Sequence, residues 1–228
     1  MSCPNCFAGH INPSTPTGHV TTLHGLDVYI AEPPENTEPK GIIVIIPDAF
    51  GWEFVNNRIL ADHYAQRGGF RVLLPDFMKG TAAPVYMLDA VRGVMATGSL
   101  WDWVVKPYAN PLSHCFISTI LVYTQRAVPR VTCHPSFLSV PGDIEKLVVP
   151  VSFALAELDS VLKGESIGVV KRVVEEKEEV GGEVRVYPRA GHGFCVRADT
   201  AVPDSSRQAE EAEEQAIAFF QRVFGRRT

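Results

Sequence analysis

Hydrophobic positions form short runs that predict strands. Mainly apolar segments occur at residues 41–47, 70–75 and 149–155, and each is too short to be a typical helix. Runs of this kind are typical of strands that helices bury on both faces. Residues 183–187, between a Gly-Gly pair and a proline, predict a further strand, and residues 26–31 alternate enough to predict an edge strand.

Between these runs, apolar residues recur at helical spacing. The spacing predicts helices from residue 54 to Gly68, over residues 165–179 and over residues 205–224. The last of these has glutamates early, arginines late and Gly225 at its end, which suits the helix dipole. Alternating strands and helices predict an α/β fold with a mostly parallel sheet covered by helices on both faces. Ligands then collect at the carboxyl ends of the strands.

The domain organisation follows from the same pattern. A chain of 228 residues with 46% hydrophobic content can form one sizeable core. Residues 1–25 are rich in Gly, Pro, Thr and His and are expected to form an N-terminal arm, followed by one domain at 26–228. Residues 84–131 fit the alternation poorly and predict an irregular, lid-like insert within that domain.

The charge and the cysteine content of the sequence indicate which classes of partner and which cellular compartment are expected. The net charge of −5 gives no broad basic surface, so nucleic acid is not expected as a partner. No apolar run reaches the roughly 18 residues of a membrane span, and the start of the chain lacks a signal-peptide pattern. An odd number of scattered cysteines predicts reduced thiols and a cytoplasmic location. These five are Cys3, Cys6, Cys115, Cys133 and Cys195.

Three candidate side chains follow predicted strands. Asp48, Asp159 and His192 each lie in a loop after a strand, so we expect them at one edge of the sheet. An aspartate that orients an imidazole suits nucleophilic hydrolysis, and the glycines of Gly-His-Gly allow an exposed histidine to sit on a sharp turn. Each residue also has a plainer interpretation: a turn aspartate for Asp48, a helix N-cap for Asp159 and an ordinary loop histidine for His192.

Several segments together resemble the dienelactone hydrolase family of α/β-hydrolases, especially its fungal branch. The resemblance runs from about Gly25 to Phe224, with the motifs in the family's order. The segments are Pro47-Asp-Ala-Phe-Gly-Trp52, Leu74-Pro-Asp76, His134-Pro-Ser-Phe-Leu138, Ala156-Glu-Leu-Asp159 and Gly191-His-Gly-Phe-Cys-Val-Arg197.

The resemblance implies hydrolysis of an enol-lactone or related ester by a cysteine, aspartate and histidine, without a metal or organic cofactor. Asp159 and His192 match the aspartate and histidine. Asp48 matches an acidic residue that interacts with the resting nucleophile. Arg197 matches an arginine that can hold a substrate carboxylate, although a solvated surface arginine is the plainer interpretation.

The family's nucleophile has no counterpart in the sequence. It belongs to a Gly-x-Cys-x-Gly-Gly elbow, and this motif is absent. The segments matching residues 126–131 and 132–136, which the family separates by a strand, turn and helix, are fused here. Such a unit needs about 30 residues, so we expect the sheet to lack a central strand. Cys133, at the junction, is the least unsuitable substitute thiol, but its loop has no elbow glycines.

A zinc site is not expected. Cys3 and Cys6 with His10 have zinc-like spacing, but a structural site needs four ligands and no second pair is present.

Three hypotheses follow. The first is a hydrolase of small lactones or carboxylic esters whose chain is shortened and inactive through loss of the cysteine nucleophile. The second is a non-catalytic protein that binds small carboxylates or lactones in the same fold. The third is an enzyme that activates water with Asp159 and His192, or uses Cys133 as its thiol.

Overall fold

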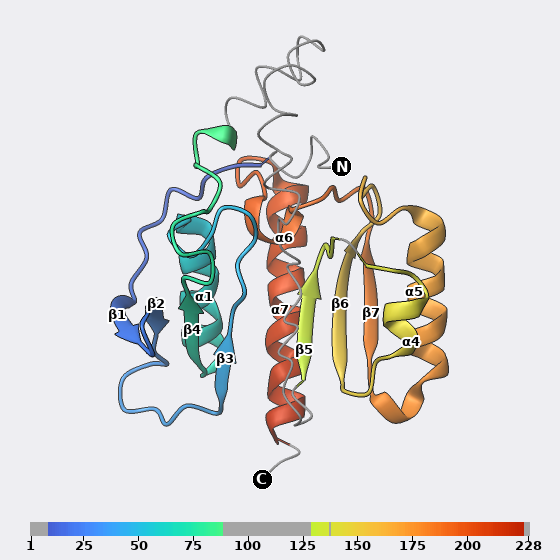
Figure 1. Cartoon of the computed structure of the whole chain (residues 1–228), viewed down its shortest axis with the longest axis horizontal. Helices are drawn as coiled ribbons and strands as arrows, with labels where there is room; N and C mark the ends of the chain where they lie inside the picture. Colours follow the sequence, from blue (N-terminus) through green and yellow to red (C-terminus); the bar gives the residue numbers. More distant parts are fainter. Residues whose placement is uncertain (1–8, 89–128, 137, 226–228) are drawn as a thin grey trace.

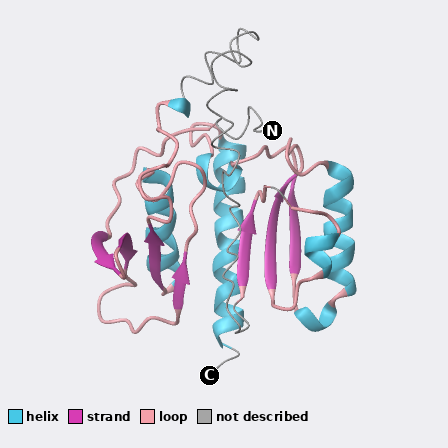
Figure 2. Cartoon of the chain, in the orientation of Figure 1, coloured by secondary structure: helices cyan, strands magenta, loops and turns pink. Residues whose placement is uncertain are grey.

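The computed structural model describes residues 9–88, 129–136 and 138–225. Figures 1 and 2 show strands alternating with helices along this part of the chain. The strands are β1 (His19–Leu23), β2 (Leu26–Ala31), β3 (Ile42–Val44), β4 (Arg71–Pro75), β5 (Arg130–Cys133), β6 (Val151–Ala156) and β7 (Glu183–Tyr187). The helices are α1 (Val55–Gly68), α4 (Gly142–Glu145), α5 (Gly164–Glu176), η4 (Glu178–Val180), α6 (Phe194–Arg197) and α7 (Pro203–Gly225).

The described strands form two sheets. One has four strands in the order β1-β2-β4-β3, and the other has three in the order β5-β6-β7. The β3–β4, β5–β6 and β6–β7 pairs are parallel, whereas β1–β2 and β2–β4 are antiparallel. The parallel pairs confirm the expected α/β fold.

The two sheets separate between β3 and β5. Figure 1 shows these strands on the facing sides of the two sheets, with α7 visible between them. Among the described residues, β3 pairs only with β4 and β5 only with β6. The expected lack of a central strand stays a prediction. Residues 89–128, which precede β5 in the chain, lie outside the described part.

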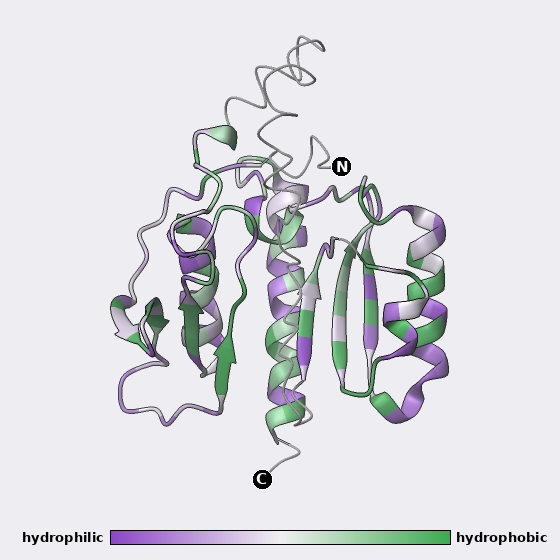
Figure 3. Ribbon diagram, viewed as in Figure 1, coloured by the Kyte–Doolittle hydropathy of each residue, from purple (hydrophilic) through white to green (hydrophobic). Residues whose placement is uncertain are grey.

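The burial of the strands explains their composition. All six residues of β6 are buried, which accounts for the apolar run that predicts this strand. Figure 3 shows β3 and β6 as largely hydrophobic ribbons. Helix α1 ends where Gly69 adopts a left-handed conformation, with φ of 78°, and its N–H donates to the carbonyl of Ala65.

Helix α7 packs against both sheets. Ala216, Phe219 and Phe220 join a core cluster with residues of β2, β3, β4 and α1 and with Val131 of β5. One turn earlier, Ala212 packs with Ala154 and Tyr187 from the three-stranded sheet. A second core cluster lies between that sheet and α5. The amphipathic pattern of residues 205–224 therefore serves packing against both sheets.

Some boundaries differ from the sequence expectations. Residues 19–23, inside the range expected to be an arm, form β1 because they pair with β2 as a mostly exposed hairpin. The helix expected over residues 165–179 is α5 followed by η4, since the chain tightens into a 3₁₀ turn before Gly181. Most of the insert expected at residues 84–131 lies outside the described residues. No described helix is both long and apolar enough to cross a membrane.

Candidate active site

Asp159 and His192 form a buried pair at the carboxyl end of the three-stranded sheet. Strands β6 and β7 are parallel neighbours, so the loops that follow them meet at one edge. The Nδ1 atom of His192 lies 2.9 Å from Oδ2 of Asp159 and 3.1 Å from Oδ1. The side chains are only 5% and 1% exposed. An ionised carboxylate at this distance accepts the Nδ1 proton and leaves Nε2 as the basic nitrogen.

The loop after β6 fixes the orientation of the Asp159 carboxylate. Its Oδ1 accepts hydrogen bonds from the backbone N–H groups of Val161, at 2.8 Å, and Leu162, at 3.4 Å. Helix α5 begins later, and its N-cap residue is Lys163. Asp159 therefore does not cap this helix, and its carboxylate is shared between a local turn and the imidazole.

The loop after β7 depends on one glycine. Gly193 has φ of 86°, and a Cβ atom there would lie 2.2 Å from Nη2 of Arg197. A side chain at this position is thus both strained and blocked. No neighbouring atom lies within 4 Å of a Cβ built on Gly191. The second glycine of the Gly-His-Gly triplet is the one that the structure requires.

Asp48 and Arg197 form a buried ion pair across the two halves of the molecule. Nη1 of Arg197 donates to Oδ2 of Asp48, and the residues are 4% and 7% exposed respectively. The other carboxylate oxygen accepts hydrogen bonds from the N–H of Phe50 and the side chain of Asn57, each at 3.2 Å. The Arg197 guanidinium also lies 5.4 Å from the Phe50 ring centroid. Arg197 is therefore not a solvated surface arginine.

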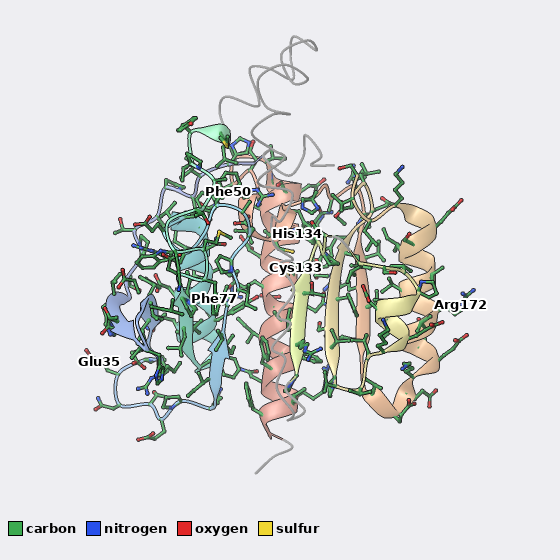
Figure 4. The ribbon with its side chains drawn as sticks, in the orientation of Figure 1. Glu35, Phe50, Phe77, Cys133, His134 and Arg172 are labelled. Atoms are coloured by element: carbon green, nitrogen blue, oxygen red, sulfur yellow. The ribbon has the colours of Figure 1, made fainter. Side chains whose placement is uncertain are left out.

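A cleft occupies the space between the two sheets. Its volume is about 60 Å³, and it reaches from β3 to β5 with α1 and α7 contributing to its walls. The wall is mainly apolar, and Asp48, Asn57, Cys133 and His134 contribute polar groups. Figure 4 shows Cys133 and His134 at one end of β5, with Phe50 across from them. The cleft therefore lies where the described strands separate.

His134 also belongs to this site, although the sequence did not predict a role for it. The residue is 2% exposed, and its ring centroid lies 4.7 Å from that of His192 in an edge-to-face arrangement. Neither ring nitrogen has a hydrogen-bond partner among the described residues. Burial, and then the nearby His192 and Arg197, hold the pKa of His134 well below its usual value. Its motif pointed to the family, but no spacing rule identified it as a site residue.

Cys133 lines the cleft as the last residue of β5. The next described helix, α4, begins only at Gly142, so the described chain does not place Cys133 at a strand-to-helix turn. Its thiol hydrogen-bonds the thiol of Cys195, and burial followed by this contact raises the pKa of Cys195. The raised pKa makes the Cys195 thiol a poor nucleophile.

The other cysteine and metal candidates are less informative. Cys3, Cys6 and Cys115 lie outside the described residues. Nε2 of His10 pairs with Oδ2 of Asp199 at 3.0 Å. Within the described part of the chain, no group of three or more His, Cys, Asp and Glu side chains could hold a metal ion.

These features define the class of the protein: an α/β-hydrolase with an aspartate–histidine pair at the strand ends. The family model of the dienelactone hydrolase family matches residues 26–103 and 118–224. The chain belongs to the dienelactone hydrolase family.

Curated relatives are similar over most of their length. Dienlactone hydrolase 1 of Gibberella moniliformis is 24% identical, with 84% of this chain and 82% of the relative covered. Hydrolase tropI of Talaromyces stipitatus is 23% identical, with 96% and 95% covered. A carboxymethylenebutenolidase homolog of Xenopus tropicalis is 22% identical, with 94% of both chains covered.

One of these alignments is longer than this chain. The alignment with hydrolase tropI spans 252 positions, although this chain has only 228 residues. That relative therefore carries residues that have no counterpart here.

Solved structures share the fold at low sequence identity. A Klebsiella pneumoniae protein described as a dienelactone hydrolase is 16% identical, with 90% of this chain and 98% of that chain covered and a TM-score of 0.61. The native esterase Est2 of Thermogutta terrifontis is 15% identical, with 90% and 94% covered and a TM-score of 0.51.

Proposed function

We propose that this protein hydrolyses small lactones or carboxylic esters, with Asp159 and His192 as its acid–base pair. The observation that carries the proposal is the 2.9 Å contact between His192 Nδ1 and the Asp159 carboxylate, in side chains almost closed to water. An imidazole held in this way presents one basic nitrogen in a fixed direction, which general-base catalysis requires.

The pair can act on a water molecule. Nε2 of His192 takes a proton from water while the water oxygen attacks the ester carbonyl, and the carboxylate of Asp159 stabilises the imidazolium. The tetrahedral intermediate then expels the alcohol oxygen, which takes the proton back from His192. The products are the carboxylic acid and the alcohol, or the open hydroxy acid from a lactone.

The remaining candidates have supporting roles in this proposal. Asp48 lines the cleft, and Arg197 holds its carboxylate in a buried ion pair in which each residue satisfies the other's charge. Cys133 also lines the cleft and is the alternative nucleophile. It lacks the turn glycines that would expose its thiol, so we assign the attack to water.

Hydrolysis by the purified 228-residue chain tests the proposal. Phenyl acetate and dihydrocoumarin serve as an ester and a lactone, and wild type is compared with His192→Ala. We expect the variant to lose about 10²–10⁴-fold in kcat/KM, because it lacks the general base. Equal rates for both proteins would exclude the catalytic role of His192.

Two controls identify the nucleophile. Cys133→Ala removes the thiol and iodoacetamide alkylates it, and we expect turnover to persist in the alanine variant if water is the nucleophile. A loss as large as that of His192→Ala would instead assign the attack to Cys133.

The second candidate function is binding without turnover. The absence of the Gly-x-Cys-x-Gly-Gly motif favours it, because the family's chemistry depends on that cysteine. A protein of this kind would bind a small lactone or carboxylate and gain thermal stability from it, while no product accumulates. Product formation that depends on His192 would exclude this alternative.

We propose a cytoplasmic location and a small-molecule partner. The odd number of scattered cysteines suits a reducing compartment, and the net charge of −5 does not suit nucleic acid.

A further inference from the structure

His134 is buried, polar and unexplained by the proposed chemistry. Both of its ring nitrogens are closed to water and lack hydrogen-bond partners among the described residues. Nearly all buried polar atoms in proteins have a partner, so an exception points to a missing water or ligand. The exception here lies in the wall of a cleft.

The backbone at His134 is also unusual. Its φ is 40°, a left-handed conformation that a residue with a Cβ atom rarely adopts. The N–H of His134 donates to the carbonyl of Ala154 at 3.0 Å, so the neighbouring strand β6 holds the residue in this position. Such conformations concentrate at ligand-binding sites.

The surroundings of His134 select the chemistry of a ligand. Burial keeps its imidazole neutral, so one ring nitrogen donates and the other accepts. Asp48 lies in the same cleft and already binds Arg197. An anionic ligand group would meet the carboxylate of Asp48, whereas an uncharged carbonyl would meet an apolar wall and an imidazole donor.

We propose that His134 binds the carbonyl oxygen of an uncharged lactone or ester in the cleft between β3 and β5. This inference rests on the proposed function and names the ligand-binding residue of the same site. The edge-to-face contact with His192 places the two imidazoles side by side. One ring then holds the carbonyl while the other activates water.

The experiment uses a carbonyl compound that cannot be hydrolysed. Cyclopentanone resembles a small lactone but has no leaving group, and methylenecyclopentane has the same shape without the oxygen. Each is titrated into full-length protein labelled with ¹⁵N in its histidines, and the ring-nitrogen resonances are followed by NMR. We expect cyclopentanone, and not methylenecyclopentane, to shift the His134 signals to saturation.

A variant measures the contribution of the ring nitrogens. His134→Phe keeps a planar ring, and we expect it to weaken cyclopentanone binding about three- to tenfold, as loss of one hydrogen bond does. His134→Gln restores a donor and should recover part of the affinity. His19→Phe, at an exposed position of β1, is the matched control and should bind as wild type does.

The outcomes separate this inference from the proposed function. Saturable shifts of His134 without any ester turnover would support the binding role and reject hydrolysis. Turnover that depends on His192, with His134 signals unmoved by saturating cyclopentanone, would overturn the binding role alone. The wild-type titration decides the matter even if His134→Phe fails to fold.

Discussion

The two sheets of this molecule differ in what they contribute. The three-stranded sheet is entirely parallel, has a fully buried strand in β6 and carries both Asp159 and His192 at its carboxyl end. The four-stranded sheet has an antiparallel hairpin at one edge and a three-residue β3 at the other. Its contribution to the site is Asp48, which reaches the other half through Arg197. One sheet thus carries the proposed chemistry, and the other completes the cleft.

In the described part of the chain, the two sheets are joined by side chains rather than by strand pairing. Among the described residues, no strand pairs β3 with β5, so side-chain contacts join the two sheets. They include the packing of α7, the packing of Val131 of β5 in one core cluster with Ile43 of β3, and the buried Asp48–Arg197 ion pair.

The largest loss of stability is expected from breaking the Asp48–Arg197 ion pair. Arg197→Met leaves the Asp48 carboxylate buried without its cation, and we expect the free energy of unfolding to fall by about 3–5 kcal/mol. Urea denaturation measures this change. Adding Asp48→Asn to the variant should restore much of the loss. A single-variant change below about 1 kcal/mol would show that the pair does not join the halves.

Truncating α7 at its core should destabilise both sheets. Phe219 is fully buried, and we expect Phe219→Ala to cost about 3–5 kcal/mol. Ile167→Val in α5 is the control, because it affects only the cluster beside the three-stranded sheet and should cost about 0.5–1.5 kcal/mol. Hydrogen exchange should accelerate in β4 and β6 for Phe219→Ala. Acceleration in β4 alone would contradict the bridging role of α7.

His134 should make the protein sensitive to acid. Its folded pKa lies below the unfolded value of about 6.5, so the unfolded chain binds the proton first as the pH falls. Stability is then lost below about pH 6.5, by at most about 1.4 kcal/mol per pH unit, until the folded pKa is reached. His134→Phe should flatten this part of the stability profile. An unchanged profile would show that His134 is not buried in the neutral form.

The smallest change in stability is expected from His63 on α1. Its Nδ1 lies 2.9 Å from Oε2 of Glu213 on α7, and this hydrogen bond raises its pKa. The resulting stability is full below about pH 6.5 and is lost as the pH rises through the folded pKa. The side chain is 46% exposed, so solvent screening keeps the effect under about 1 kcal/mol. His63→Gln should remove this dependence in thermal melts between pH 6 and 8.

Much of the fold could be predicted from the sequence because its signals are local. The apolar run of β6 and the stripe of α7 each reflect burial of one segment, and both elements lie within a few residues of their predicted bounds. The hairpin of β1 was not predicted, since its residues are mostly exposed and pairing with β2 alone orders them. Hydrophobic periodicity does not record such pairing.

The candidate site could be predicted only in part. Chain order and strand ends indicated that Asp159 and His192 should meet, and the structure brings them together. The partner of Arg197 could not be predicted, because Asp48 lies 149 residues away in the chain. His134 was missed for a similar reason. Its significance depends on burial and on two unpaired nitrogens, which only the folded arrangement reveals.

A double-mutant cycle of kcat/KM on dihydrocoumarin tests the central claim most directly. It compares wild type, Asp159→Asn, His192→Ala and the double variant, because residues that act as one catalytic unit give non-additive losses. We predict that the double variant loses no more activity than His192→Ala alone. Additive losses, or no turnover by the wild-type chain, would contradict the proposal that the three-stranded sheet carries a catalytic aspartate–histidine pair.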